Sequence, residues 1–401
     1  MEREILGRIS RLSPSNPASA NHDYAFMKTI ALLLTLCVVA VAVWPSPSHS
    51  ESVTKAGQPR MEVCFVLDTT GSMSGLIEGA KQKIWSIANE MVGAKPAPEL
   101  RFGLVAYRDR GDQYVLKTFD LTNDIDAVYA SLQSFSAGGG GDTPESVNEA
   151  LNEAVTKMSW SEDRRVLKIV FLVGDAPPHM DYANGPKYPD VCQAAMKKDL
   201  IINTIQCGSM TRTTPIWREI AKLSEGSYAA IAQEGGMVAI ATPMDDELAR
   251  LNRELGATIV AYGGERTRRE VYAKQAAAET APVAVAADRL SFNVKAGKTV
   301  QGEGELLDSL ASGKLKIGEL KKDQLPKEWQ GLSETKLKAA IAKKQAERAA
   351  LQTKILKLNT EREDYLAAER KKVAKADSFD EQVASTIRAQ AARKGIAYGG
   401  K

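Results

Sequence analysis

The sequence predicts an α/β fold in which helices cover both faces of a doubly wound, mostly parallel sheet of six strands, followed by an α-helical C-terminal region. Two observations support this. Between residues 61 and 262, short apolar runs alternate with segments whose apolar residues recur every three or four positions, as strands joined by amphipathic helices do. Several runs, such as residues 169–173, are apolar throughout, which is typical of strands buried on both faces.

The elements of this sheet domain follow one another in a regular order. Strands are expected at residues 61–67, 101–107, 114–119, 167–173, 200–207 and 227–232. The helix after the first strand has an apolar face made by Leu76, Ile77, Ala80, Ile84, Ile87 and Met91. Further helices are expected near 124–134, 144–158, 189–199, 214–224 and 244–255. Sheets of this kind bind ligands at the carboxyl ends of their strands, so a site is expected in the loops there.

The composition changes beyond the sheet domain. Residues 263–299 are expected to form a helix and an alanine-rich linker, with the linker at 275–298, and residues 300–401 a helical region. Residues 334–374 contain no glycine or proline and predict one long helix. Its apolar seam suits an imperfect coiled coil, interrupted by Lys344 and Arg348, through which the chain could self-associate. A helical hairpin closing on residues 379–393 is the simpler interpretation.

The N-terminus carries the pattern of a secretory signal peptide, predicted over residues 27–50. Met27-Lys28 precedes an apolar run at residues 30–43, and small residues around Ser50 follow. Residues 1–26 are interpreted as an extension before the native start, and residues 51–60 as a short lead-in. We therefore expect an exported protein, periplasmic or secreted, with peripheral association to the envelope. An uncleaved inner-membrane anchor is the alternative, although the run is shorter than the about 20 residues of a membrane span.

Three cysteines remain after the predicted cleavage. Cys64 lies inside a buried strand and is expected to be a core residue. Cys192 and Cys207 are a candidate disulfide, because an exported protein meets oxidising conditions.

Charge and composition argue against several classes of function. The net charge is only +3 and the charges are interspersed, so no nucleic-acid footprint is visible. Only His179 remains after the predicted cleavage, which excludes a zinc site built on several histidines. The HExxH, GxSxG and GxxxxGK[ST] motifs are absent, which argues against the common hydrolases and nucleotide-binding proteins.

Oxygen-bearing side chains gather in three segments that each lie near the carboxyl edge of the predicted sheet. Asp68, Thr70 and Ser72 follow the first strand, Thr143 follows a run of four glycines, and Asp175 follows the strand at 167–173. Hard divalent cations prefer such oxygen ligands. Because hydroxyls are uncharged, a metal held by them keeps much of its charge and can accept a carboxylate from another molecule. The pattern therefore indicates a binding site rather than a catalytic one.

These residues resemble the metal-ion-dependent adhesion site of von Willebrand factor type A (VWA) domains, which reads Asp-x-Ser-x-Ser, then a distant Thr and a distant Asp. The resemblance covers roughly residues 61–262, with Thr70 in place of the first Ser. The Asp-Ala-Pro-Pro-His ending at residues 175–179 resembles bacterial members and the domain attached to some atypical alpha-type kinases. No kinase region follows here.

The resemblance implies roles for the individual residues. Thr70, Ser72 and Thr143 would be direct or near-direct ligands of Mg²⁺, or of Mn²⁺ or Ca²⁺, while Asp68 and Asp175 would act mostly through water. Candidates for groups around the ligands are Asp142, Glu145 and His179. Asp142 and Glu145 are equally well explained as charges at a helix start.

The sequence thus favours a non-enzymatic module that binds a protein partner through its Asp or Glu, in a metal-dependent way. One alternative is a structural or oligomerising protein that acts through its helices, with the sheet domain as a docking scaffold. The other is a metal-assisted hydrolase using Asp68, Asp175 and His179, for which no activated nucleophile is evident.

Overall fold

The computed structural model describes residues 58–237, 240–372 and 378–398. The expected signal segment at 27–50 and the extension at 1–26 lie outside the described residues. In the described part of the chain, no helix is both long and apolar enough to cross a membrane.

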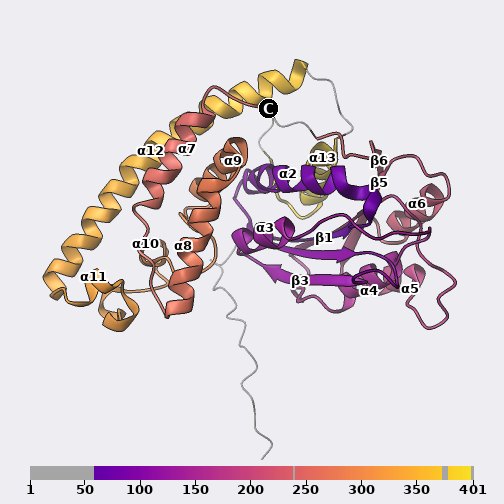
Figure 1. The fold of residues 1–401 in the computed structure, drawn as a ribbon, viewed down its shortest axis with the longest axis horizontal. Coiled ribbons are helices and arrows are strands. Elements are labelled where there is room, and N and C mark those ends of the chain that lie inside the picture. The colour runs from indigo at the N-terminus through magenta and orange to yellow at the C-terminus, as the bar shows by residue number, and fades with distance from the viewer. Residues whose placement is uncertain (1–57, 238–239, 373–377, 399–401) are drawn as a thin grey trace, which may run out of the picture. The chain divides into compact units, whose positions relative to one another are not determined.

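The sheet has six strands, and its order places the first strand in the middle (Figure 1). All neighbouring strands are parallel except the pair formed by β2 and β3. The order β3-β2-β1-β4-β5-β6 reverses direction between β1 and β4, which is where such sheets bind ligands. The predicted fold class is confirmed. The strands are β1 (Arg60–Asp68), β2 (Glu99–Tyr107), β3 (Leu116–Thr122), β4 (Leu167–Gly174), β5 (Leu200–Cys207) and β6 (Tyr228–Ile231).

Two hydrophobic clusters cover the two faces of the sheet, and β1 shows why they are distinct. Val63 and Phe65 belong to one cluster, while Cys64 and Val66 between them belong to the other, because successive strand residues point to opposite faces. The first cluster includes side chains from α2 (Ser74–Val92), α3 (Ile125–Gln133), α9 (Val283–Lys295) and α13 (Phe379–Arg393). The second includes α4 (Val147–Thr156), α5 (Tyr188–Lys197) and α6 (Thr213–Leu223).

The predicted disulfide between Cys192 and Cys207 is wrong. Both cysteines are free and fully buried, and they belong to the clusters on opposite faces of the sheet. Proximity in the sequence could not reveal this, since the helix that carries Cys192 packs on one face while Cys207 points to the other. Cys64 is a buried core residue, as expected.

The alanine-rich segment expected as a linker is helical instead. Residues 275–298 contain the end of α8 (Glu265–Thr280) and all of α9. Alanine is the strongest helix former, and α9 buries Leu290 in one hydrophobic cluster and Phe292 in another. It packs against α2 and against α7 (Asp245–Gly256), so this segment is part of the packed structure.

The long helix predicted near 334–374 is present as α12 (Glu334–Lys372), and it packs within the same chain against α7 and α9. Its seam residues Leu351, Ile355 and Leu358 join a cluster with Leu251 and Leu290. The N-terminal end of α12 lies over a compact arrangement of α10 (Leu306–Ala311), α11 (Lys327–Gln330) and the single turns η2 (Ile317–Glu319) and η3 (Lys322–Gln324).

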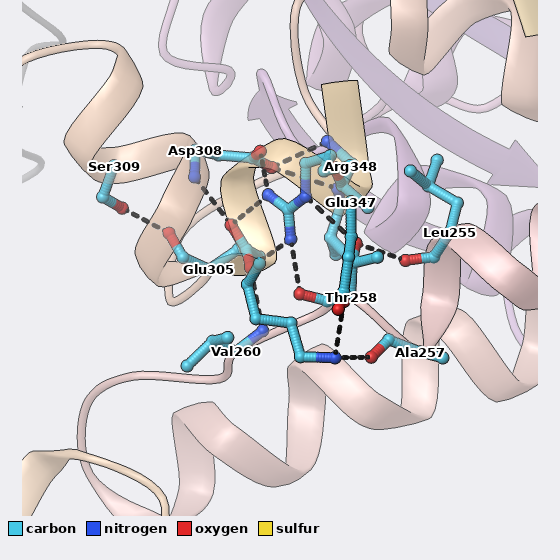
Figure 2. Close-up of polar contacts among 12 residues, drawn as sticks. Leu255, Ala257, Thr258, Val260, Glu305, Asp308, Ser309, Glu347 and Arg348 are labelled. Atoms are coloured by element: carbon cyan, nitrogen blue, oxygen red, sulfur yellow. Dashed lines mark hydrogen bonds and ion pairs between the residues drawn. The ribbon is translucent and has the colours of Figure 1, made fainter. Parts of the chain in front are cut away.

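The two residues that interrupt the seam make polar contacts inside the chain, and Figure 2 shows those of Arg348. Lys344 Nζ donates to the carbonyl oxygen of Ala257 at 3.0 Å. The Arg348 guanidinium pairs with Glu305 and Asp308. These contacts explain why the heptad pattern is broken at these positions.

The predicted helical hairpin between α12 and residues 379–393 is wrong, because α13 packs against α2 and β4. The Phe379 ring lies 6.2 Å from that of Phe65 in β1. Asn203 of β5 and Gln390 exchange hydrogen bonds of 2.7 and 3.1 Å. The four-residue spacing of Phe379, Val383, Ile387 and Ala391 gives α13 one apolar face, and the apolar sheet buries it fully. The last helix therefore completes the sheet domain.

Candidate metal centre

Three loops meet at the carboxyl edge of the sheet, next to its reversal point. Asp68 ends β1 and Asp175 follows β4, and these neighbouring strands are paired in parallel up to Leu67 and Val173. The glycine-rich loop lies against the first segment. Gly138 N donates to Thr69 O at 3.1 Å, and Gly71 N donates to Gly139 O at 3.2 Å.

The first segment forms a chain of oxygen atoms centred on Asp68. The Thr70 backbone N–H and hydroxyl donate to Asp68 Oδ1 at 2.9 and 2.6 Å. The Thr70 hydroxyl lies 3.4 Å from the Ser72 hydroxyl. Asp68 is fully buried, and its Oδ2 has no hydrogen-bond partner. A buried carboxylate oxygen without a partner costs free energy, which a bound cation would offset.

The other two predicted ligands are held by side chains from outside the motif. Asp175 is 8% exposed, and its Oδ2 accepts a hydrogen bond from Gln233 Nε2 at 2.8 Å. The Thr143 hydroxyl accepts a hydrogen bond from the Arg212 guanidinium at 3.3 Å. The structure thus joins Asp68, Thr70 and Ser72 directly, and it places Asp175 and Thr143 on the adjoining loops.

Buried carboxyl groups make the binding of a positive charge at this site favourable. Burial, with a smaller contribution from the nearby charge of Asp175, raises the pKa of Asp68 to about 7. Burial, together with the charge of Asp68, raises the pKa of Glu145 to about 9. Groups whose charged forms are this disfavoured bind either a proton or a cation.

The three residues predicted to surround the metal ligands, Asp142, Glu145 and His179, lie in different environments. Glu145 is buried, with its Oε2 unpartnered, and Gly140 lies between it and Thr70. A β-carbon on Gly140 would lie 3.2 Å from Thr70 Cβ and 3.4 Å from Glu145 Oε1. Asp142 is exposed. Glu145 therefore lies beside the oxygen chain, while Asp142 faces solvent.

His179 belongs to a neighbouring polar cluster. Its Nδ1 lies 2.7 Å from Asp181 Oδ1, and its Nε2 lies 3.3 Å from Asp109 Oδ2. Its ring stacks on Tyr182 with 4.0 Å between the centroids. These contacts fix His179 in the loop after β4.

Sequence reasoning missed two residues that shape the site. Gln233 donates to Asp175 and also, at 3.2 Å, to the backbone oxygen of Ser72. Gly174 ends β4, and a β-carbon there would lie 2.4 Å from the Tyr107 hydroxyl oxygen and 2.8 Å from Asp68 Cβ. Gln233 follows β6 at the same edge of the sheet. Its place just after a predicted strand was the only feature of the sequence that could have marked it as a residue of the site.

The donor set fits a hard divalent cation. Two carboxylates and three hydroxyls come from Asp68, Asp175, Thr70, Ser72 and Thr143, all of them oxygen ligands of the kind that Mg²⁺, Mn²⁺ and Ca²⁺ prefer. Within the described ranges, no three His, Cys, Asp or Glu side chains are grouped so as to hold a metal. The hydroxyls would therefore be necessary ligands.

Comparison with known proteins assigns the class of this domain. Residues 62–243 match the family model of the von Willebrand factor A domain, and the chain contains a VWA domain over this range. It is 32% identical over 174 residues to von Willebrand factor A domain-containing protein 7 of Homo sapiens, and 33% identical to that of Rattus norvegicus. These matches cover 43% of this chain and 18% of each relative, so the chain spans about a fifth of their length.

Solved structures with similar folds share little sequence with this chain. Proximal thread matrix protein 1 from the mussel byssus, solved with a zinc-occupied MIDAS motif, is 16% identical, with a TM-score of 0.35 and coverage of 44% of this chain and 43% of that one. The SpRpn10 VWA domain is 14% identical, with a TM-score of 0.35 and coverage of 45% and 91%. Similarity at this level supports no inference about ligands.

Proposed function

We propose that this protein is a divalent-metal-dependent protein-binding module of the cell envelope. Its metal site would consist of Asp68, Thr70, Ser72, Thr143 and Asp175, with Mg²⁺ as the expected ion. When bound there, a divalent cation would supply positive charge that attracts an Asp or Glu side chain of a protein partner. Binding at this site, rather than turnover, is its proposed role.

One observation carries the proposal: the Asp68 carboxylate is fully buried at the carboxyl edge of the sheet, bonded to Thr70 on one oxygen and unpartnered on the other. A helix cap would explain the hydroxyls, but neither the Thr70 nor the Ser72 side chain caps a helix here. The helix η1 (Gly71–Met73) and α2 both begin without a side-chain capping bond. The hydroxyls are therefore available to a ligand.

The alternative of a structural protein acting through its helices has weaker support. The apolar residues that would form a coiled-coil seam, such as Leu351 and Ile355, pack on α7 and α9 of the same chain. The hydrolase alternative needs His179 as a base, but Asp109 and Asp181 surround its ring nitrogens.

Export to the periplasm or outside the cell is part of the proposal and rests on the signal-like segment at 27–50 alone. Fractionation of cells that express the protein with a C-terminal tag tests this part separately from metal binding. Recovery in the cytoplasm at full precursor mass would contradict it.

Titration calorimetry of the purified protein with Mg²⁺ and Mn²⁺ tests the metal site. We expect saturable binding that is abolished by Asp68→Ala and weakened by Ser72→Ala and Thr143→Ala. Ser74→Ala is the matched control, because Ser74 is an exposed serine of the same segment outside the motif. A metal-dependent pull-down of partners would follow. Binding of Mg²⁺ that survives Asp68→Ala would contradict the proposal.

A further inference from the structure

We propose that Gln233, which lies outside the adhesion-site motif, is a positioning residue for this metal centre. The inference rests on the proposed metal site and adds a residue to it. Gln233 would hold the first and third ligand-bearing segments at the spacing that a cation requires, by bonding to both at once.

The side-chain amide of Gln233 joins the two segments directly. Its Nε2 donates to Asp175 Oδ2 at 2.8 Å and to the backbone oxygen of Ser72 at 3.2 Å. One of these acceptors is the carboxylate of a proposed ligand, and the other is the main chain of a second proposed ligand. Loss of the amide would free the Asp175 carboxylate to rotate, and it would remove a direct hydrogen-bonded link between these two loops.

The position of Gln233 is itself fixed by close packing on a glycine. A β-carbon on Gly208, after β5, would lie 2.2 Å from Gln233 Oε1, so the absence of a side chain there makes room for the amide. Gly208 has a positive φ of 72°, which glycine adopts without strain. The loop after β5 therefore accommodates the Gln233 side chain as it crosses toward Asp175.

The segment that follows Gln233 is packed against the start of α2, the helix that begins at the metal-binding loop. A β-carbon on Gly75 would lie 2.8 Å from Glu234 Cβ, and the Gly235 carbonyl oxygen accepts a hydrogen bond from Phe379 N at 2.9 Å. Backbone on both sides of this segment thus determines where the Gln233 side chain can reach. The last helix, α13, contributes one of these contacts from far along the sequence.

An amide is well suited to this role because it donates a hydrogen bond without adding charge. A lysine or arginine at the same place would neutralise Asp175 and compete with the cation. Side chains that orient metal ligands typically change metal affinity by roughly 10–100-fold when they are removed. Mg²⁺ demands near-ideal octahedral geometry, whereas Ca²⁺ accepts irregular sites, so loss of orientation should weaken Mg²⁺ binding more.

The test compares Gln233→Met, which keeps the side-chain length but has no donor, with the unsubstituted protein. We expect the dissociation constant for Mg²⁺ to rise by roughly 10–100-fold by calorimetry, with a smaller rise for Ca²⁺. The unfolding temperature in EDTA should fall by only a few degrees, because the two hydrogen bonds that are lost each contribute modestly to the stability of the metal-free protein. Gln233→Ala repeats the test should the methionine variant fail to fold. Glu234→Gln, a substitution of the adjoining exposed residue, is the matched control. This variant should bind Mg²⁺ as tightly as the unsubstituted protein does.

The outcomes separate this inference from the proposed function. No Mg²⁺ binding by the unsubstituted protein would overturn both. Binding that Asp68→Ala abolishes but that both Gln233 variants retain within about threefold would overturn the positioning role alone. An equal loss of affinity for Mg²⁺ and Ca²⁺, together with a fall of more than about 10 °C in the unfolding temperature in EDTA, would show a merely structural role and would also overturn the positioning role.

Discussion

Replacing Arg348 with methionine should strongly destabilise the helical region, because this arginine is the centre of a buried ion-pair network (Figure 2). Arg348 is 5% exposed, and Glu305 is 3% exposed. All five of the N–H groups of a guanidinium are used here: two donate to Glu305, one to Asp308 and two to Thr258. The network ties α12 to α10 and to the loop after α7.

The magnitude follows from the charges left behind. Methionine fills a similar volume, so little packing is lost, but the buried Glu305 and the partly buried Asp308 would lose their cation. Removing one partner of a buried ion pair costs about 3–5 kcal/mol in unfolding free energy. Lysine at position 348 should lower the unfolding free energy less than methionine does, because it keeps the positive charge. Some loss remains, because lysine has only three donors and no planar guanidinium.

Urea unfolding followed by circular dichroism would measure this loss, with amide hydrogen exchange in α10 and α12 showing where it occurs. Arg250→Met is the matched control. Arg250 of α7 also pairs with two glutamates, Glu247 and Glu254, but it does so on the surface, where solvent screens the charges. It should leave the unfolding free energy nearly unchanged. Equal effects of the Arg348 and Arg250 substitutions would refute the argument from burial.

Three further predictions concern the sheet domain. Because burial raises the pKa of Asp68 from 3.8 to about 7, the folded metal-free protein binds a proton there that the unfolded chain releases. Stability in EDTA should therefore fall as pH rises from about 4 to about 7, and a thermal-melt series in which Asp68→Asn does not flatten this slope would contradict the assignment. Gly174→Ala should abolish Mg²⁺ binding in calorimetry, since the added carbon would lie 2.4 Å from the Tyr107 hydroxyl oxygen, and retained affinity would mean that the edge of the sheet yields. Phe379→Ala should cost about 3–5 kcal/mol in urea unfolding, because this 2% exposed ring fills the sheet's core; a loss below about 1 kcal/mol would show that α13 is not needed there.

Local patterns predicted most of the sheet domain. The apolar runs located all six strands to within a few residues, most clearly β4, whose residues are all buried. The motif residues Asp68, Thr70 and Ser72 are in contact as the spacing suggested. Alanine-rich residues 275–298 were misjudged as a linker, since α9 within them is stabilised by contacts with α2 and α7 that the sequence does not display.

The sequence by itself determined the order of strands and helices, the site's position at the strand ends and the oxygen character of its side chains, because periodicity and residue chemistry are local properties. Only the tertiary structure decided that Cys192 and Cys207 face opposite sides of the sheet, that α13 returns to complete the core, and that Gln233 bonds to Asp175. Each of these depends on which distant segments compete best for the same buried surface. That competition is settled by the packing of the whole chain.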